Sequence, residues 1–156
     1  MPTHSCRQFV PAVRPSVLVV DADEDTRDLY RCAFETHGFR VLEARDGREA
    51  LTRALAQRPA VVVTEVRLAY VDGYALCEIL RRDPATMNVP VLVVSADPHP
   101  AHQQRARSAG ATQVLVKPVA IDAIVEALQD VVEAAQSAQD DPAAAATGSR
   151  QLKPIT

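Results

Sequence analysis

The sequence has no run of about 18 consecutive apolar residues, which is the length that a membrane-spanning helix needs. Residues 1–16 also lack the continuous apolar core of a signal peptide. These two absences predict a cytoplasmic protein with no membrane partner. An excess of positive charge is missing as well, because the formal net charge is −3. We therefore expect no nucleic-acid partner and no binding to anionic lipid.

Cysteine is scarce, and its spacing argues against two kinds of stabilising site. The three cysteines are Cys6, Cys32 and Cys77. An odd count, without C-x-x-C or a histidine at metal-binding spacing, argues against a disulfide framework and a zinc site. Cys32 and Cys77 fall within predicted helices and are expected to be buried free thiols. His99 and His102 precede or begin a polar helix, and we expect them to be solvated.

The remaining composition is that of an ordinary globular protein. The chain has 156 residues, of which 47% are hydrophobic and 24% charged. This length and composition predict a single domain. Residues 1–15 contain three prolines and no periodicity, and they are predicted to form a flexible arm. Residues 16–135 are predicted to form the domain, and the small, Ala-rich residues 136–156 a disordered tail.

Five short, valine-rich segments alternate with five helical patterns in the central part. The segments are Val17–Val20, Arg40–Glu43, Val61–Thr64, Val91–Ser95 and Val114–Val116. Three of them are almost continuously apolar, as in strands covered on both faces. The helical patterns span 24–37, 47–57, 73–82, 100–109 and 120–135. This alternation predicts an α/β fold, a doubly wound five-stranded parallel sheet with helices on both faces.

The helical patterns also predict which side chains face the core. In the first helix, Leu29, Cys32, Ala33 and Thr36 lie on one stripe that is expected to be buried. In the third, Arg81 and Arg82 are expected on the solvated surface.

Polar residues follow four of the five predicted strands. Asp21 and Asp23 follow the first, Glu65 follows the third, Ser95 ends the fourth and Lys117 follows the fifth. In an open parallel sheet, functional residues gather beyond the carboxyl ends of the strands. We therefore expect Asp21, Glu65, Ser95 and Lys117 to meet at one edge. Asp23 or Asp25 is the expected N-cap of the following helix.

Four sequence blocks resemble, in order and spacing, those of response-regulator receiver domains in two-component signalling, the CheY-like family. The blocks are VLVVDADED, PAVVVTEVRLAYVDGYALCEILR, VPVLVVSAD and AGATQVLVKPV. The resemblance covers about 120 residues and implies a flavodoxin-like (βα)5 fold with strand order 2-1-3-4-5. It also implies a phosphorelay module whose partners are a histidine kinase or a downstream effector.

The match to the family's site is partial. In the family, a histidine kinase phosphorylates an aspartate after the third strand, and an acidic pair after the first strand holds Mg²⁺. Here Glu65 occupies the acceptor position, and Ala22 replaces one member of the acidic pair. Ser95 and Lys117 match the hydroxyl and the lysine that contact the phosphoryl oxygens. Val114 occupies a position where many members carry an aromatic residue that moves on activation.

These departures predict an atypical receiver, or pseudo-receiver, that is not phosphorylated. The carboxylate of a glutamate lies one methylene further out, and a displacement of about 1 Å can cost on the order of 100-fold in rate. Because Ala22 supplies no carboxylate, the remaining candidate metal ligands are Asp21 and, as a substitute, Asp23. We therefore expect no cofactor, with a weakly bound Mg²⁺ as the alternative. Glu65 either pairs with Lys117 or partly mimics a phosphoryl group.

Three functions are therefore compared. The leading one is a stand-alone atypical receiver that acts by protein–protein interaction, through residues 100–109 and 120–132 or through Tyr70 and Val71. The alternative is a working phosphorelay receiver that accepts phosphate with Mg²⁺. An enzyme that uses Asp21, Glu65 and Lys117 is least favoured. No glycine-rich phosphate loop, nucleophile elbow or dinucleotide fingerprint is present to support it.

Overall fold

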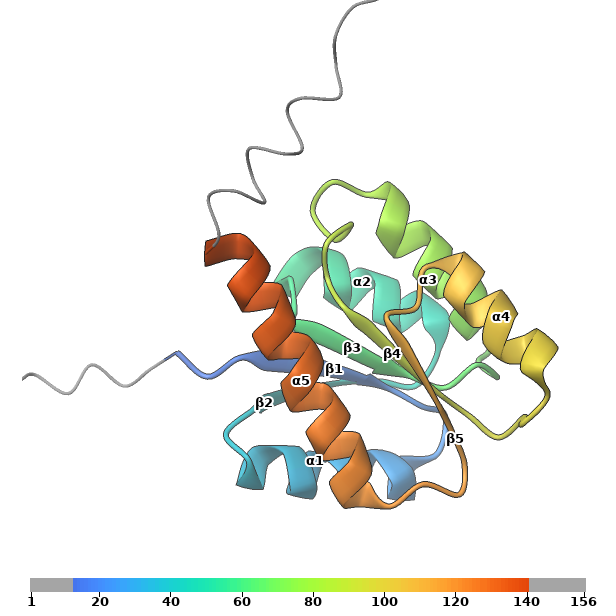
Figure 1. Ribbon diagram of the computed structural model, residues 1–156, viewed down its shortest axis with the longest axis horizontal. Coiled ribbons are helices and arrows are strands. Elements are labelled where there is room, and N and C mark those ends of the chain that lie inside the picture. Colours follow the sequence, from blue (N-terminus) through green and yellow to red (C-terminus); the bar gives the residue numbers. More distant parts are fainter. Residues whose placement is uncertain (1–12, 141–156) are drawn as a thin grey trace, which may run out of the picture.

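The computed structural model describes residues 13–140, which form a five-stranded parallel sheet with the strand order β2-β1-β3-β4-β5 (Figure 1). The strands are β1 (Ser16–Val20), β2 (Arg40–Ala44), β3 (Val61–Thr64), β4 (Val91–Ser95) and β5 (Gln113–Val116). The predicted strand order is confirmed, and each strand boundary lies within one residue of its prediction.

Five helices connect the strands and cover both faces of the sheet. They are α1 (Glu24–Thr36), α2 (Gly47–Gln57), α3 (Gly73–Arg82), α4 (Pro100–Ala109) and α5 (Ile121–Asp140). Helices α1 and α5 lie on one face, and α2, α3 and α4 lie on the other (Figure 1). Helix α5 continues five residues beyond its predicted end at 135. None of the helices in residues 13–140 is long and apolar enough to cross a membrane.

Alternation along the strands divides the core into two halves. In β1, Val17 and Val19 pack toward α1 and α5, whereas Leu18 and Val20 pack toward the other three helices. All five residues of this strand are buried. Because β1 pairs with both β2 and β3, it has no free edge, and helices cover both of its faces. The apolar pattern that predicted two-sided burial is thus confirmed.

The predicted inner stripe of α1 is wrong for Leu29, Cys32 and Thr36, whereas Ala33 is partly buried against the core as predicted. Leu29 is 56% exposed and Cys32 is exposed, while Tyr30 and Phe34 face the core. The two aromatic rings lie 5.5 Å apart, centroid to centroid. Tyr30 and Phe34 fit the space between α5 and the sheet, and there they remove more apolar area from water than leucine and cysteine would.

The two helical cysteines differ in burial, because they lie on differently oriented stripes of their helices. Cys77 lies in α3 and is fully buried, as predicted, and burial raises the pKa of its thiol to about 11. Such a thiol is unreactive at neutral pH because it is not ionised. Cys32 was wrongly predicted to be buried, because it lies on the outward stripe of α1. Cys6 and His4 lie outside the described residues, as do most of the predicted arm and tail.

Arg81 was expected on the solvated surface, and the structure places it in a network of backbone acceptors instead. Its Nε donates to the carbonyl of Gly110 at 3.0 Å, and Nη1 donates to the carbonyls of Met87 and Val89. The side chain therefore ties α3 to the loops before β4 and β5. Arg82, its neighbour, is exposed as predicted.

Candidate functional site

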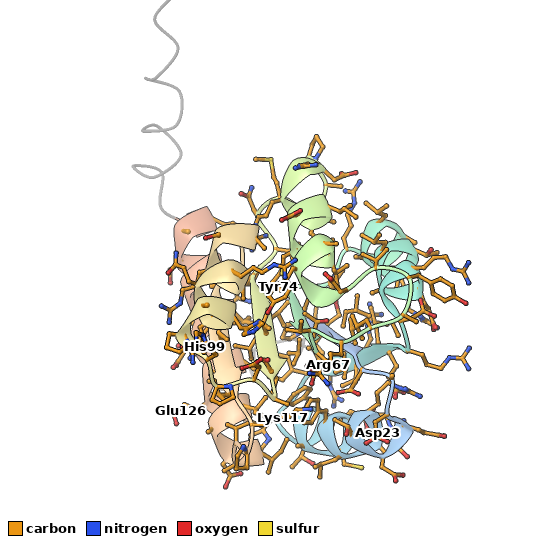
Figure 2. All side chains as sticks on the ribbon, turned by 90° about the vertical axis from the view of Figure 1, so that its right-hand side faces the viewer. Asp23, Arg67, Tyr74, His99, Lys117 and Glu126 are labelled. Carbon is orange, nitrogen blue, oxygen red and sulfur yellow. The ribbon has the colours of Figure 1, made fainter. Side chains whose placement is uncertain are left out.

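The ends of β1, β3, β4 and β5 bring the predicted site residues to one edge of the sheet. Backbone hydrogen bonds continue past the strands: Glu65 N–H donates to Val20 O at 3.0 Å, and Lys117 N–H donates to Ser95 O at 2.8 Å. These bonds fix where each side chain leaves the sheet. Figure 2 views the molecule from the right-hand side of Figure 1, and labels Lys117 at the carboxyl ends of the strands.

Lys117 and Glu65 form a close ion pair at the centre of this edge. Lys117 Nζ lies 2.8 Å from Glu65 Oε2 and 3.9 Å from Asp21 Oδ2. The other carboxylate oxygen, Glu65 Oε1, accepts a hydrogen bond from the Val66 backbone N–H at 2.8 Å. The side chains of Glu65 and Asp21 are only 13% and 10% exposed. Both oxygens of Glu65 are therefore already partnered by groups of the protein.

Burial, hydrogen bonds and neighbouring charges together shift the pKa values of Asp21 and Lys117, the two ionisable neighbours of Glu65. Burial raises the pKa of Asp21, and the charge of Glu65 adds to this, against the hydrogen bond from Asp23 N–H and the charge of Lys117. Burial by itself lowers the pKa of Lys117. The hydrogen bond to Glu65 and the charges of Glu65 and Asp21 outweigh this effect, so the net pKa of Lys117 is raised.

Replacing Asp21 with asparagine is expected to leave the protein as stable at pH 7, or slightly more stable. Because the folded-state pKa of Asp21 is raised, its contribution is most favourable below the ordinary pKa and declines as pH rises through the folded value. Asparagine is uncharged and can still accept the hydrogen bond from Asp23 N–H. We expect a gain below about 1.4 kcal/mol, the equivalent of one pKa unit, in urea unfolding at pH 7. A clear loss of stability would contradict this account of Asp21.

The metal ligands implied by the resemblance do not fit Mg²⁺, which needs several oxygen ligands in octahedral geometry. Ala22 offers no side-chain ligand. Asp23 caps α1, where its Oδ2 accepts from the Thr26 hydroxyl at 2.6 Å and from Thr26 N–H at 3.3 Å. Glu65 is paired with Lys117. Within residues 13–140, no group of three or more His, Cys, Asp and Glu side chains could hold a metal ion.

Ser95 ends β4, the strand that lies between β3, which precedes Glu65, and β5, which precedes Lys117. It is 6% exposed, and its Oγ accepts a hydrogen bond from Asp97 N–H at 3.1 Å. Glu65 and Ser95 line a small hollow of about 120 Å³ between α3 and α4. A hollow of this size is far below the 300–1,000 Å³ typical of small-molecule sites. Val114 lies in β5 opposite Val93, half-buried, and packs against the core cluster of α2, α3 and α4.

Gly73, at the start of α3, packs directly on the backbone of the acceptor position. A Cβ at this glycine would lie 2.5 Å from the carbonyl oxygen of Glu65 and 2.8 Å from the Cα of Val66. Asp72 caps the same helix by accepting from Ala75 N–H at 2.8 Å. The Asp72–Gly73 pair of the sequence therefore holds α3 against the strand end that carries Glu65.

Sequence reasoning did not assign to the site five further polar side chains that line the hollow: Arg67, Tyr74, Asp97, His102 and Arg105. Tyr74 enters from α3, Asp97 from the β4–α4 loop, and His102 and Arg105 from α4. His102 was expected to be solvated, and its side chain is 45% exposed, but it contacts both Tyr74 and Asp97. No periodicity could have revealed this group, because its members meet only through the packing of α4 against α3. The signal that was available is the position of Tyr74 directly after Asp72–Gly73.

Comparison with known proteins agrees with the fold. Residues 17–129 match the response regulator receiver domain family. The polar-differentiation response regulator DivK of Brucella anthropi is 27% identical over 114 residues, which cover 73% of this chain and 93% of that protein. The DNA-binding dual master transcriptional regulator RpaA of Synechocystis is 31% identical over 108 residues, which cover 69% of this chain and 45% of that protein.

Solved receiver structures superpose on most of the chain. The chemotaxis response regulator CheY4 of Vibrio cholerae has a TM-score of 0.71 at 29% identity, covering 75% of this chain and 98% of that one. The receiver domain of the Francisella response regulator 1452 has a TM-score of 0.72 at 29% identity, covering 76% and 97%. Members of this family are signalling modules rather than enzymes, and they interact with histidine kinases and effectors. This chain belongs to the response regulator receiver domain family of two-component signalling.

Proposed function

We propose that this receiver is not phosphorylated and acts in signal transduction through protein–protein interaction. The observation that carries the proposal is the closed ion pair at the acceptor position. Lys117 and the Val66 N–H partner both oxygens of Glu65. An incoming phosphoryl donor would have to break both contacts before either oxygen could attack. The donor would also meet a site in which Ala22 offers no metal ligand.

Electrostatics supports the same proposal. A phosphoryl donor and a carboxylate acceptor are both anions, and phosphoryl transfer depends on neutralising the charge that they bring together. In this site Lys117 is already engaged by Glu65 and lies near Asp21, so its charge is shared between two carboxylates. A small anionic donor therefore gains little attraction on approach.

The experiment is incubation of the purified protein with acetyl phosphate and Mg²⁺, followed by intact-mass measurement. We expect no increase in mass. The opposing function, a working phosphorelay receiver, predicts a gain of about 80 Da per phosphoryl group. Loss of that gain in a Glu65→Gln variant would assign the phosphoryl group to Glu65 and would refute our proposal.

An apolar recess beside the site is a second feature that favours protein interaction. It lies between α1 and the β5–α5 loop and has a volume of about 500 Å³. Leu29, which is 56% exposed, lies along it, and Val119 and Ile121 line the α5 side. Lys117 forms one end. A partner whose side chains fill this recess would lie next to the Glu65–Lys117 pair, so we infer that the histidine kinase or effector docks here.

Leu29→Lys is expected to weaken binding to such a partner by at least about 10-fold, since burying an unpaired ammonium group in an apolar contact is costly. Stability should change by less than about 0.5 kcal/mol, because residue 29 is exposed. Leu55→Lys is the matched control, because Leu55 is 44% exposed on α2, on the other face of the sheet. Binding can be measured by calorimetry with a histidine kinase or effector that has been isolated by affinity capture on the wild-type protein. Equal effects of the two variants would refute the docking site.

Glu65 has a further proposed role as a partial mimic of a phosphoryl group, since its carboxylate already contacts Lys117. A mimic predicts that Glu65→Gln weakens partner binding while the fold is retained.

The cytoplasmic location and the absence of a nucleic-acid partner remain predictions from the sequence.

A further inference from the structure

The hollow beside Glu65 contains an aromatic side chain that comes from α3 rather than from β5. Tyr74 is the second residue of α3 and is 6% exposed. The guanidinium carbon of Arg105 lies 4.4 Å from the centroid of its ring, and its hydroxyl lies 3.3 Å from Nδ1 of His102. Tyr74 therefore contacts α4 at two residues that are one turn apart. In Figure 2 its label lies on α3, beside α4.

A chain of polar contacts continues from Tyr74 to the end of β4. Nε2 of His102 lies 3.1 Å from Oδ2 of Asp97. The backbone N–H of Asp97 donates to Ser95 Oγ at 3.1 Å. The contacts thus run from Tyr74 through His102 and Asp97 to Ser95. Ser95 shares its hollow with Glu65, so one end of the chain lies at the acceptor position and the other on α3.

A neutral imidazole satisfies both contacts of His102. With its proton on Nε2 it donates to Asp97, and its Nδ1 accepts from the Tyr74 hydroxyl. Burial raises the pKa of Tyr74, so the phenol keeps its proton and remains a donor. Asp97 is fixed in turn, because its Oδ1 accepts from the backbone N–H of His99, the N-cap of α4.

Helix α4 has little else to hold it in place. Its only buried residues are Ala106 and Ala109, and an alanine methyl group buries little apolar area. By contrast, α3 buries Leu76 and Leu80 together with other large side chains. The orientation of α4 therefore depends on polar contacts to a much greater extent than that of α3. A helix held in this way is suited to being shifted by a small change at the other end of the contacts.

We propose that Tyr74, His102 and Asp97 form a latch that couples the acceptor position to the orientation of α4. Ser95 links these residues to the acceptor position, because any change at residue 65 that displaces the Ser95 hydroxyl also displaces the Asp97 backbone. His102 and Tyr74 transmit the displacement to α4, since their contact fixes α4 against α3. The latch gives this receiver an aromatic contact that reports on the site although Val114 carries no ring. It goes beyond the proposed function, whose docking recess lies between α1 and the β5–α5 loop.

The test is amide hydrogen exchange of the full chain without a partner or phosphodonor. Tyr74→Phe removes one hydroxyl and keeps the ring, and His102→Ala removes both imidazole contacts. A net hydrogen bond of about 0.5–1.5 kcal/mol corresponds to exchange about 2- to 12-fold faster for the amides of α4. The matched control is Gln104→Ala, because Gln104 is exposed and its side chain hydrogen-bonds to Ser108 of the same helix. Its exchange in α4 should match that of the wild type.

Coupling to the acceptor position is measured by adding Glu65→Gln to three backgrounds: the wild type, Tyr74→Phe and His102→Ala. We expect this change to alter α4 exchange in the wild type and to have little effect in Tyr74→Phe or His102→Ala. Equal effects in all backgrounds would refute the latch, as would unchanged exchange in both latch variants. Because no phosphodonor is present, phosphorylation of the wild type in a separate assay would overturn the proposed function and leave this result standing.

Discussion

The double variant Ala22→Asp, Glu65→Asp is expected to gain about 80 Da on incubation with acetyl phosphate and Mg²⁺, under conditions that leave the wild type unmodified. The second carboxylate would join Asp21 at the end of β1 and provide the charge that a hard divalent ion requires. The shorter side chain at 65 would retract from Lys117 by one methylene. The lysine, which now lies 2.8 Å from Glu65, would then be free to meet the incoming phosphoryl oxygens.

The single variants separate the two defects. Ala22→Asp alone restores the metal ligand but leaves Glu65 paired, and Glu65→Asp alone restores the acceptor without the second carboxylate. Each is expected to be modified at least about 10-fold more slowly than the double variant, because positioning and charge neutralisation are both required. The control is Ala22→Asp, Glu65→Asn, which has the added ligand and no acceptor. Modification of this control, or none in the double variant, would show that other residues decide reactivity.

Lys117→Met is expected to lower the free energy of unfolding by about 1–3 kcal/mol at pH 7, because it leaves the largely buried carboxylate of Glu65 without its cation. The hydrogen bond from Val66 N–H remains, but Oε2 loses its partner. Asp21 also loses its nearest positive charge. Urea unfolding at equilibrium measures the effect, and the slope of the transition checks that the variant still unfolds in one step.

A second substitution distinguishes loss of the ion pair from loss of packing. Adding Glu65→Gln to Lys117→Met removes the uncompensated charge and is expected to recover about half of the lost stability. Arg82→Met is the matched control, since Arg82 is exposed at the end of α3 and should change stability by less than about 0.5 kcal/mol. If Lys117→Met changed the stability as little as Arg82→Met, the Glu65 carboxylate would not need the lysine as its counter-ion. The closed ion pair would then no longer support the proposed function.

Local signals in the sequence were sufficient for the architecture. The apolar segments that became β1, β3 and β4 are buried on both faces, as expected for a parallel sheet between two helical layers. The site edge was predictable for a related reason. Residues that directly follow parallel strands must meet at one edge, so Asp21, Glu65, Ser95 and Lys117 could be placed together before any distance was known.

Local signals were not sufficient to predict which stripe of a helix faces the core. Two adjacent stripes of α1 are both apolar, and the choice between Leu29 with Cys32 and Tyr30 with Phe34 depends on the space left between α5 and the sheet. Arg81 likewise could not be placed, because its acceptors belong to loops that lie near α3 only after folding.

The sequence alone determined the fold, the edge that carries the site and the substitutions at positions 22, 65 and 114, because these depend on residue type and on the order of the strands. The tertiary structure decided what those residues contact. Only it shows that Glu65 has both oxygens partnered, and that Tyr74 reaches His102, 28 positions along the chain. The physical reason is range: burial patterns repeat over a few residues, whereas a hydrogen bond between helices depends on how the whole domain packs.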